Sequence, residues 1–293
     1  MSDTPTTGAA AADPVLEEAA VTRGGRAILA PVRLRLGPGV HGVIGANGAG
    51  KTTLLRLLAG HLRDDAGRRL AADTALGRVA HDVHPAGRDV RAHLDLAGIG
   101  HPGLDRRLAL AILADAGVEE RSRTARLSNG QRQLLSAAVA LASGAATVLL
   151  DEPFNGLDAA TRRGLRERII AVLADRPGLR LVLTSHRAED LAGLVDDLIV
   201  VAGGRVHPPI ALDDARDRYP VLAGPADAVA ALAGGRPRVA TRRIGGIAEA
   251  TLAAPLDAAA RARAAGLGVT LTPLDDNALI DAMAMHAPAG ATP

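Results

Sequence analysis

Residues 45–52 constrain the fold more than any other part of the chain. They read Gly-Ala-Asn-Gly-Ala-Gly-Lys-Thr and fit the pattern G-x-x-x-x-G-K-[S/T]. An apolar strand is predicted before them, at 40–44, and a helix after them, at about 51–61. Glycines let backbone N–H groups turn inward around phosphate oxygens, and the helix N-terminus adds the positive end of its dipole. The segment therefore predicts an α/β fold with a phosphate-binding loop.

The side chains that end this loop suit a nucleotide carrying Mg²⁺. Lys51 is the only lysine in 293 residues, and it supplies a point charge for β- and γ-phosphate oxygens. The Thr52 hydroxyl can ligate the metal ion. We therefore expect nucleotide contacts from Gly45, Asn47, Gly48, Gly50, Lys51, Thr52 and Thr53.

Two carboxylates follow an apolar strand at residues 147–150. Ligands of open α/β sheets bind at the carboxyl ends of the strands, where Asp151 and Glu152 lie. Alone, such a pair is usually a solvated turn. Together with the phosphate loop, it predicts that Asp151 holds Mg²⁺, directly or through water. Glu152 is then expected to polarise an attacking water as a general base.

Apolar strands alternate with helices up to residue 202, which indicates a mostly parallel, buried sheet. The character changes near 203–204, and Pro208-Pro209 suits a linker. The last stretch, about 80 residues long, follows a β-α-β-β-α-β order with one extra helix, as in ferredoxin-like domains. The predicted organisation is a flexible tail at 1–13, a nucleotide-binding domain at 14–206 with a helical subdomain at about 85–142, and an accessory α+β domain at 207–290.

Composition excludes several classes of function. Cysteine is absent, which removes disulfides and thiolate-ligated metals, and Phe154 and Tyr219 are the only aromatic residues, which leaves no base-stacking platform. The net charge of +2 is spread along the chain, so no nucleic-acid partner is expected. No apolar run approaches the ~18 residues of a membrane span, and the N-terminus lacks the features of a secretory signal. A cytoplasmic protein is expected.

A further motif, Leu-Ser-Asn-Gly-Gln at 127–131, gives the chain a resemblance to the ATP-binding-cassette (ABC) ATPases. The motif is similar to the LSGGQ signature of that family. The order of motifs also matches: phosphate loop, signature, the Asp151-Glu152 strand, a D-loop at 155–158, and a switch histidine, His186. The match covers roughly residues 15–206 and implies a P-loop NTPase fold of the ABC type.

The resemblance implies a head-to-tail dimer, with itself or with a paralogous cassette, that holds two ATP molecules between its subunits. Signature residues Ser128, Asn129, Gly130 and Gln131 would face the γ-phosphate of ATP held by the other subunit, as a helix N-terminus favours anions. His186 would contact the γ-phosphate. Asp158 would communicate across the interface.

Two positions depart from the family pattern. The family usually has a metal-contacting glutamine after the phosphate-loop helix, and the corresponding segment offers His81, with Asp82 as a second candidate. A less active site, or coupling carried by shape alone, is the alternative. The family also usually stacks adenine on an aromatic residue, and Arg23 stands near that place. Its guanidinium can stack on a base; weak adenine selectivity is the other outcome.

The leading hypothesis is an ATP-hydrolysing subunit that drives a separate membrane permease from the inner face of the cell membrane through dimer closure. A single cassette with a trailing domain resembles the ATPase subunits of bacterial ABC-2-type exporters, so export is expected. The alternative is a regulatory or soluble ABC-type ATPase with weak turnover and no transport role. The DNA-repair type inserts a long coiled coil, for which the stretch between Lys51 and Leu127 is too short.

Overall fold

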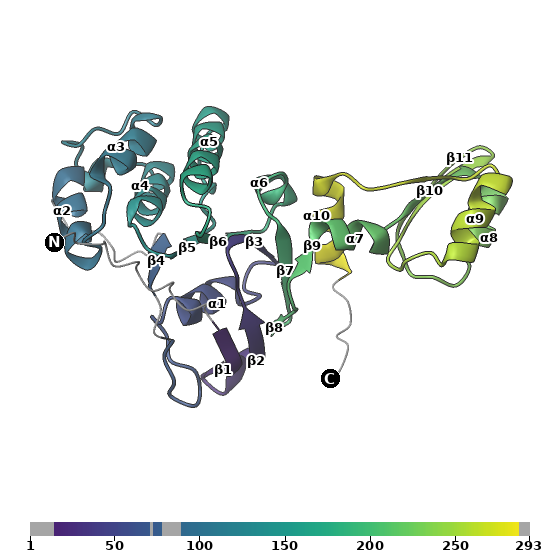
Figure 1. Ribbon diagram of the computed structural model, residues 1–293, viewed down its shortest axis with the longest axis horizontal. Helices are drawn as coiled ribbons and strands as arrows, with labels where there is room; N and C mark the ends of the chain where they lie inside the picture. The colour runs from purple at the N-terminus through teal and green to yellow at the C-terminus, as the bar shows by residue number, and fades with distance from the viewer. Residues whose placement is uncertain (1–14, 71–72, 78–88, 287–293) are drawn as a thin grey trace, which may run out of the picture. The chain divides into compact units, whose positions relative to one another are not determined.

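The computed structural model describes residues 15–70, 73–77 and 89–286 (Figure 1). Backbone contacts divide the chain into two units. The first combines Met1–Gly39 with Thr52–Val182, and the second combines Val40–Lys51 with Leu183–Pro293. The phosphate loop and the carboxylate strand thus belong to different units.

The first unit opens with an antiparallel strand pair, β1 (Val15–Arg23) and β2 (Arg26–Arg35). The turn between them consists of Gly24 and Gly25, whose φ angles of +55° and +75° suit glycine. In the second half of β2, Val32 and Leu34 are buried while Arg33 and Arg35 are exposed, which is the alternation of a strand with one covered face. The sequence did not predict β1.

Parallel strands and helices form the rest of this unit. β4 (Thr74–Gly77) pairs parallel with β5 (Thr147–Asp151), and every residue of β5 is buried. α1 (Lys51–Leu58) confirms the helix predicted after the phosphate loop, and α4 (Asn129–Ala142) and α5 (Ala159–Asp175) are the two longer helices of this unit. α4 packs against both β4 and β5. β6 (Arg180–Ser185) begins in this unit.

Short helices between β4 and α4 correspond to part of the predicted helical subdomain. They are α2 (Val90–Gly100), α3 (Arg106–Ala114) and the 3₁₀ helix η1 (Thr124–Arg126). α3 packs along α4 through its buried face.

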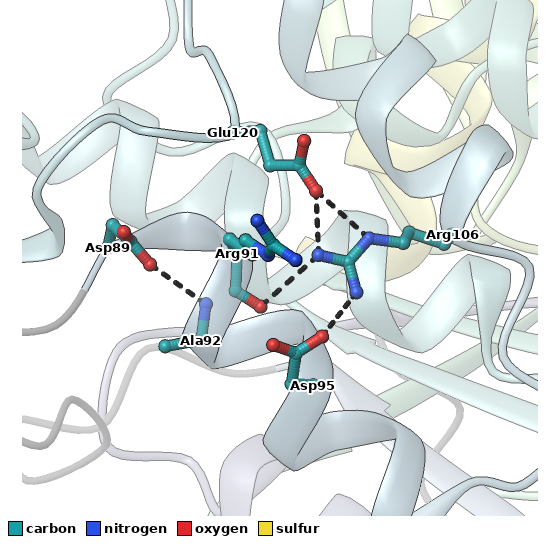
Figure 2. A network of polar contacts seen from close by, with 6 residues as sticks. All are labelled: Asp89, Arg91, Ala92, Asp95, Arg106 and Glu120. Atoms are coloured by element: carbon teal, nitrogen blue, oxygen red, sulfur yellow. Dashed lines mark hydrogen bonds and ion pairs between the residues drawn. The ribbon is translucent and has the colours of Figure 1, made fainter.

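Arg106 ties these helices together (Figure 2). Its guanidinium donates to Glu120 Oε1 from two nitrogens, at 3.1 and 2.7 Å, and also to the Asp95 carboxylate on α2. Hydrogen bonds to Asp95 and then Glu120 raise the pKa of Arg106. Asp89 caps α2 by accepting the Ala92 N–H at 2.9 Å. Charge-assisted bonds of this kind fix the angle between neighbouring segments.

In the second unit, β3 (Gly39–Ile44) pairs parallel with β7 (Asp197–Ala202). The short strands β8 (Arg205–Val206) and β9 (Ile210–Ala211) both pair antiparallel with β7. Near the start of β3, buried His41 places Nδ1 2.9 Å from the Asp197 carboxylate. α6 (Ala188–Leu191) lies between β6 and β7 in the chain.

Two helices that flank the C-terminal region pack together in this unit. α10 (Asp276–Met285) contacts α6, β7 and α7 (Leu212–Arg218). Asp276 accepts the Gly193 N–H at 3.2 Å and pairs with Arg216. These contacts hold α10, the last helix of the described residues, against α6, α7 and β7.

A four-stranded antiparallel sheet lies between α7 and α10 in the chain. Its strand order is β11-β12-β10-β13, and its apolar core includes Leu222, Val229, Leu252 and Ala260. In this sheet β12 lies between β10 and β11, as in ferredoxin-like domains. Along the chain, the elements follow the predicted β-α-β-β-α-β order, which is confirmed. The elements are β10 (Val221–Pro225), α8 (Ala226–Ala233), β11 (Arg238–Ile244), β12 (Ile247–Leu252), α9 (Ala258–Gly266) and β13 (Thr270–Thr272).

Candidate functional site

The phosphate loop connects β3 to α1 in the second unit. Gly48 and Gly50 have φ angles of +78° and +114°, which other residues rarely adopt. Gly45 is required for a different reason, because a Cβ there would stand 2.2 Å from the Val201 carbonyl oxygen on β7. The exposed residues Asn47 and Gly48 form the outer part of the loop.

Lys51 begins α1 and is buried, with a relative exposure of 6%. Its Nζ donates to the carbonyl oxygens of Gly45, at 2.7 Å, and Ala46, at 3.4 Å. The ammonium is therefore enclosed by the loop that precedes it. An ammonium held in this way beside a helix N-terminus attracts a phosphate group.

Thr52 and Asp151 come together in the first unit. The Thr52 hydroxyl donates to Asp151 Oδ2 at 2.7 Å, from the first turn of α1 to the end of β5. Asp151 is 7% exposed, and Thr53 beside Thr52 is half-buried. Neighbouring oxygen ligands of octahedral Mg²⁺ lie about 2.9 Å apart for bonds of about 2.05 Å. The spacing and chemistry of these two oxygens therefore fit Mg²⁺.

No cluster of three or more His, Cys, Asp or Glu that could hold a metal occurs among residues 15–70, 73–77 and 89–286. Mg²⁺ does not need such a cluster, because it usually keeps several waters and binds one or two protein side chains together with substrate phosphates. A hydroxyl and one carboxylate match that pattern.

Glu152 follows Asp151 in a strained backbone conformation. Its φ of +51° is unusual for a residue with a side chain, and such outliers gather at functional sites. Its carbonyl accepts the Asn155 N–H at 3.1 Å, which starts the turn toward the D-loop. The side chain is partly exposed, so water can reach the carboxylate.

The signature residues form the N-terminus of α4. Ser128 Oγ accepts the Gln131 N–H at 3.1 Å, and Gln131 Oε1 accepts the Ser128 N–H at 3.0 Å. This is a capping box. Gln131 Nε2 also donates to the Ala116 carbonyl at 3.2 Å, and Asn129 Oδ1 accepts from Arg132 at 2.9 Å. Ser128 is exposed, and its hydroxyl hydrogen can still donate to a ligand.

Gly130 is buried against the D-loop of the same chain. A Cβ at Gly130 would lie 2.3 Å from the Gly156 carbonyl oxygen, much closer than real Cβ contacts. Gly156 itself has a φ of +74°. The signature helix and the D-loop therefore approach each other as closely as backbones can.

Asp158 ends the D-loop and precedes α5, and His186 comes directly after β6. Asp158 caps α5 by accepting the N–H groups of Ala160 and Thr161, both at 2.9 Å. The Thr161 N–H, followed by the Thr161 hydroxyl, holds the pKa of Asp158 below its usual value. His186 directly follows β6, where its side chain is exposed in the second unit.

The two departures from the family pattern have different outcomes. Arg23 is the last residue of β1, exposed beside the Gly24-Gly25 turn. His81 and its alternative Asp82 lie outside the described residues, so their roles stay predictions.

Sequence reasoning missed Gln133. This residue lies on α4 and is 7% exposed, and its Nε2 donates to the Asp151 carbonyl at 2.8 Å. The signal that could have found it was rarity, because Gln131 and Gln133 are the only glutamines in the chain.

Within the part of the chain that the structure covers, every helix is too short or too polar to cross a membrane.

Comparisons with known proteins agree with this geometry. The profile of the ABC transporter family matches residues 29–155. The aliphatic sulfonates import ATP-binding protein SsuB of Ralstonia nicotianae is 36% identical over 67% of this chain and 72% of its own length. SsuB of Mycobacterium avium is 37% identical over 66% of this chain and 79% of its own length.

Solved structures show the same fold. An ATP-binding subunit of an ABC transporter superposes with a TM-score of 0.60 at 23% identity, over 69% of this chain and 91% of that one. A bacterial ABC transporter cassette solved as a dimer gives a TM-score of 0.56 at 20% identity, over 67% of this chain and 97% of that one. The predicted P-loop NTPase fold of the ABC type is confirmed.

The direction of transport needs a correction. Both SsuB relatives are named as import proteins, so the expectation of export, which rested on a resemblance of domain layout, is not supported. The coarser prediction holds: this chain belongs to the ATP-binding subunits of ABC transporters, which are ATPases.

Proposed function

We propose that the chain binds Mg²⁺-ATP, hydrolyses it and drives a separate membrane permease in the import direction. The carrying observation is the 2.7 Å bond between the Thr52 hydroxyl and Asp151, with Glu152 as the next residue. Two metal-binding oxygens thus adjoin a carboxylate that water can reach. The import direction rests on the names of the relatives.

Each residue has a definite task in this proposal. Lys51 neutralises β- and γ-phosphate oxygens as ATP binds, and Thr52 and Asp151 would hold a Mg²⁺ ion that would neutralise further phosphate charge. Glu152 orients the attacking water and accepts its proton, and His186 contacts the γ-phosphate. Backbone N–H groups of the loop complete the phosphate site: Gly45, Asn47, Gly48, Gly50 and Thr53.

The proposal includes a nucleotide-sandwich dimer. Its support is the similarity to a cassette solved as a dimer and the form of the signature, which presents an exposed Ser128 at a helix N-terminus. In that dimer Ser128, Asn129, Gly130 and Gln131 face the other subunit's ATP, and Asp158 lies at the interface. Opening and closing of the dimer moves the permease at the inner face of the membrane.

The test of the enzyme part compares ATP turnover of the purified protein with that of Glu152→Gln. We expect the variant to bind ATP but to hydrolyse it at least 100-fold more slowly, because it lacks the general base. Equal turnover in the two proteins would favour a regulatory ATPase with no transport role. In that case His81, which stands where the family usually has a metal-contacting glutamine, becomes the first residue to study.

The test of the transport part uses the native permease. Wild-type protein is expected to copurify with a membrane protein. In intact cells, the ATP of the cytoplasm is expected to drive uptake through that protein. Failure to capture any membrane protein would argue against the transporter role. ATP-driven efflux would refute the import direction alone.

A further inference from the structure

Glu152 keeps a backbone conformation that its own sequence does not favour. Its φ of +51° is in the left-handed region, and the residue that follows is Pro153. A side chain makes the left-handed region unfavourable, and a following proline restricts the backbone further. Such a conformation persists only when the surrounding structure holds it.

Gln133 on α4 restrains this backbone from one side. Its Nε2 donates to the Asp151 carbonyl oxygen at 2.8 Å, and the side chain is 7% exposed. That carbonyl and the Glu152 N–H belong to the same rigid peptide plane. A hydrogen bond that fixes the oxygen therefore also limits the rotation that sets φ of Glu152. On the other side, the Glu152 carbonyl accepts the Asn155 N–H at 3.1 Å.

We propose that Gln133 is a positioning residue that locks the Asp151–Glu152 peptide and so aims the Glu152 carboxylate at the attacking water. This inference rests on the proposed role of Glu152 as the general base. The same peptide plane begins at the carbonyl group of Asp151. The Oδ2 atom of Asp151 accepts from the Thr52 hydroxyl at 2.7 Å, so the Gln133 hydrogen bond also fixes the end of the strand that carries the metal ligand.

The lock also connects the carboxylates to the signature. Gln133 lies one turn after the start of α4, the helix that Ser128 and Gln131 cap. Gly130, in the first turn, is packed against Gly156 of the D-loop. A shift of the N-terminal end of α4 would therefore move the Asp151–Glu152 peptide through the Gln133 side chain. It would also move the D-loop through the backbone contact between Gly130 and Gly156.

Gln133→Met tests the proposal, because methionine has a similar length and volume but cannot donate a hydrogen bond. We expect kcat for ATP to fall by about 10- to 100-fold, since misplacement of a reacting group by about 1 Å costs about 100-fold. The Kd for ATP, measured with a fluorescent analogue, is expected to stay within about twofold, because binding depends on the phosphate loop.

Two further variants separate positioning from simple loss of packing. Val172→Ala removes buried side-chain volume on α5, at a residue with 4% exposure, and is expected to lower the melting temperature without lowering kcat. The double variant Gln133→Met/Glu152→Gln is expected to match Glu152→Gln alone, because groups that act as one unit are not additive. Single-turnover assays with excess protein measure these slow rates.

Wild-type turnover in Gln133→Met would overturn the inference and leave the proposed function intact. A double variant that falls below Glu152→Gln by the full factor seen for Gln133→Met would also overturn it, since Gln133 would then act elsewhere. If wild type and Glu152→Gln turn over equally, the proposed function fails and the inference fails with it. Should Gln133→Met not fold, Gln133→Asn replaces it, because its amide is one methylene too short to reach Asp151 and the same expectations apply.

Discussion

Substitution of Gly130 by alanine sets two physical effects against each other. Gly130 lies in the first turn of α4, where helix propensity favours alanine over glycine by about 1 kcal/mol. The new Cβ, however, would stand 2.3 Å from the Gly156 carbonyl oxygen and 2.9 Å from its carbon. Both of these atoms are backbone, so no flexible side chain can move aside.

The distances decide which effect is larger. Ordinary contacts of a Cβ begin at 3.4 Å, so the D-loop or the start of α4 must shift by about 1 Å. Overpacking of this kind costs about 1–3 kcal/mol. After the gain in propensity, we expect a net destabilisation of about 1 kcal/mol, which corresponds to a fall in melting temperature of about 2–4 °C for a domain of about 200 residues.

A matched control exists on α2. Gly98 is also helical, but a Cβ there would meet no atom within 4 Å. Gly98→Ala should therefore raise the melting temperature of the nucleotide-free protein, whereas Gly130→Ala should lower it. Melting is measured without nucleotide, because a nucleotide-bound sample would also report the contact proposed between Gly130 and the ATP of the other subunit.

Turnover provides the second readout. A D-loop displaced by about 1 Å is expected to reduce kcat by about 100-fold, while ATP still binds to the phosphate loop. A Gly130→Ala protein that melts higher than wild type, as Gly98→Ala does, would refute the close approach between α4 and the D-loop. Normal turnover together with a lower melting temperature would show that the D-loop shift has no consequence for catalysis.

Three other substitutions test separate parts of the structure. Lys51→Ala should raise the Kd for ATP at least 100-fold, measured with a fluorescent analogue, because the enclosed ammonium is the only side-chain cation of the loop; wild-type affinity would contradict this. Thr52→Ala should raise the Mg²⁺ concentration needed for half-maximal turnover, and an unchanged dependence would argue against its role as a metal ligand. Asp257 caps α9, and the Ala260 N–H, followed by nearby arginines, holds its pKa below the usual 3.8. Its stabilising effect is present above the unfolded pKa and lost as pH falls through the lower folded pKa. Thermal scans of Asp257→Ala should thus show a deficit at about pH 6 that shrinks below about pH 3; a constant deficit would count against the cap.

The sequence predicted the elements whose signals are local. β5 is apolar throughout, and its burial requires nothing beyond a parallel sheet. α4 starts at Ser128 because Ser-x-x-Gln is a capping box, which operates within four residues. The phosphate loop likewise has Gly48 and Gly50 at the positions that demand positive φ. In each case, the residues that determine the element lie inside it.

β1 was missed for an equally physical reason. Its buried residues, Leu16, Ala19 and Val21, do not alternate strictly, because Glu18 adopts a φ of +54° and shifts the register between Leu16 and Ala19. A bulge of this kind disrupts the two-residue period by which strands are predicted. α7 was missed as well. Its sequence, Leu-Asp-Asp-Ala-Arg-Asp-Arg, has only two apolar residues, Leu212 and Ala215, and the helix is stabilised when these two pack against the rest of the unit.

The sequence predicted Gly45 and Gly130 as site residues and missed Gln133, but the contacts that constrain all three share a property that motifs cannot express. Gln133 bonds the main-chain oxygen of Asp151, and Gly130 and Gly45 are confined by the main-chain oxygens of Gly156 and Val201. Every residue carries such an oxygen, so the partner leaves no mark of its own in the sequence. Only the register of a helix against a strand or loop determines which oxygen comes into reach. Motifs thus identify side chains that meet the ligand, whereas groups that hold those side chains in place become visible only when the backbones are placed.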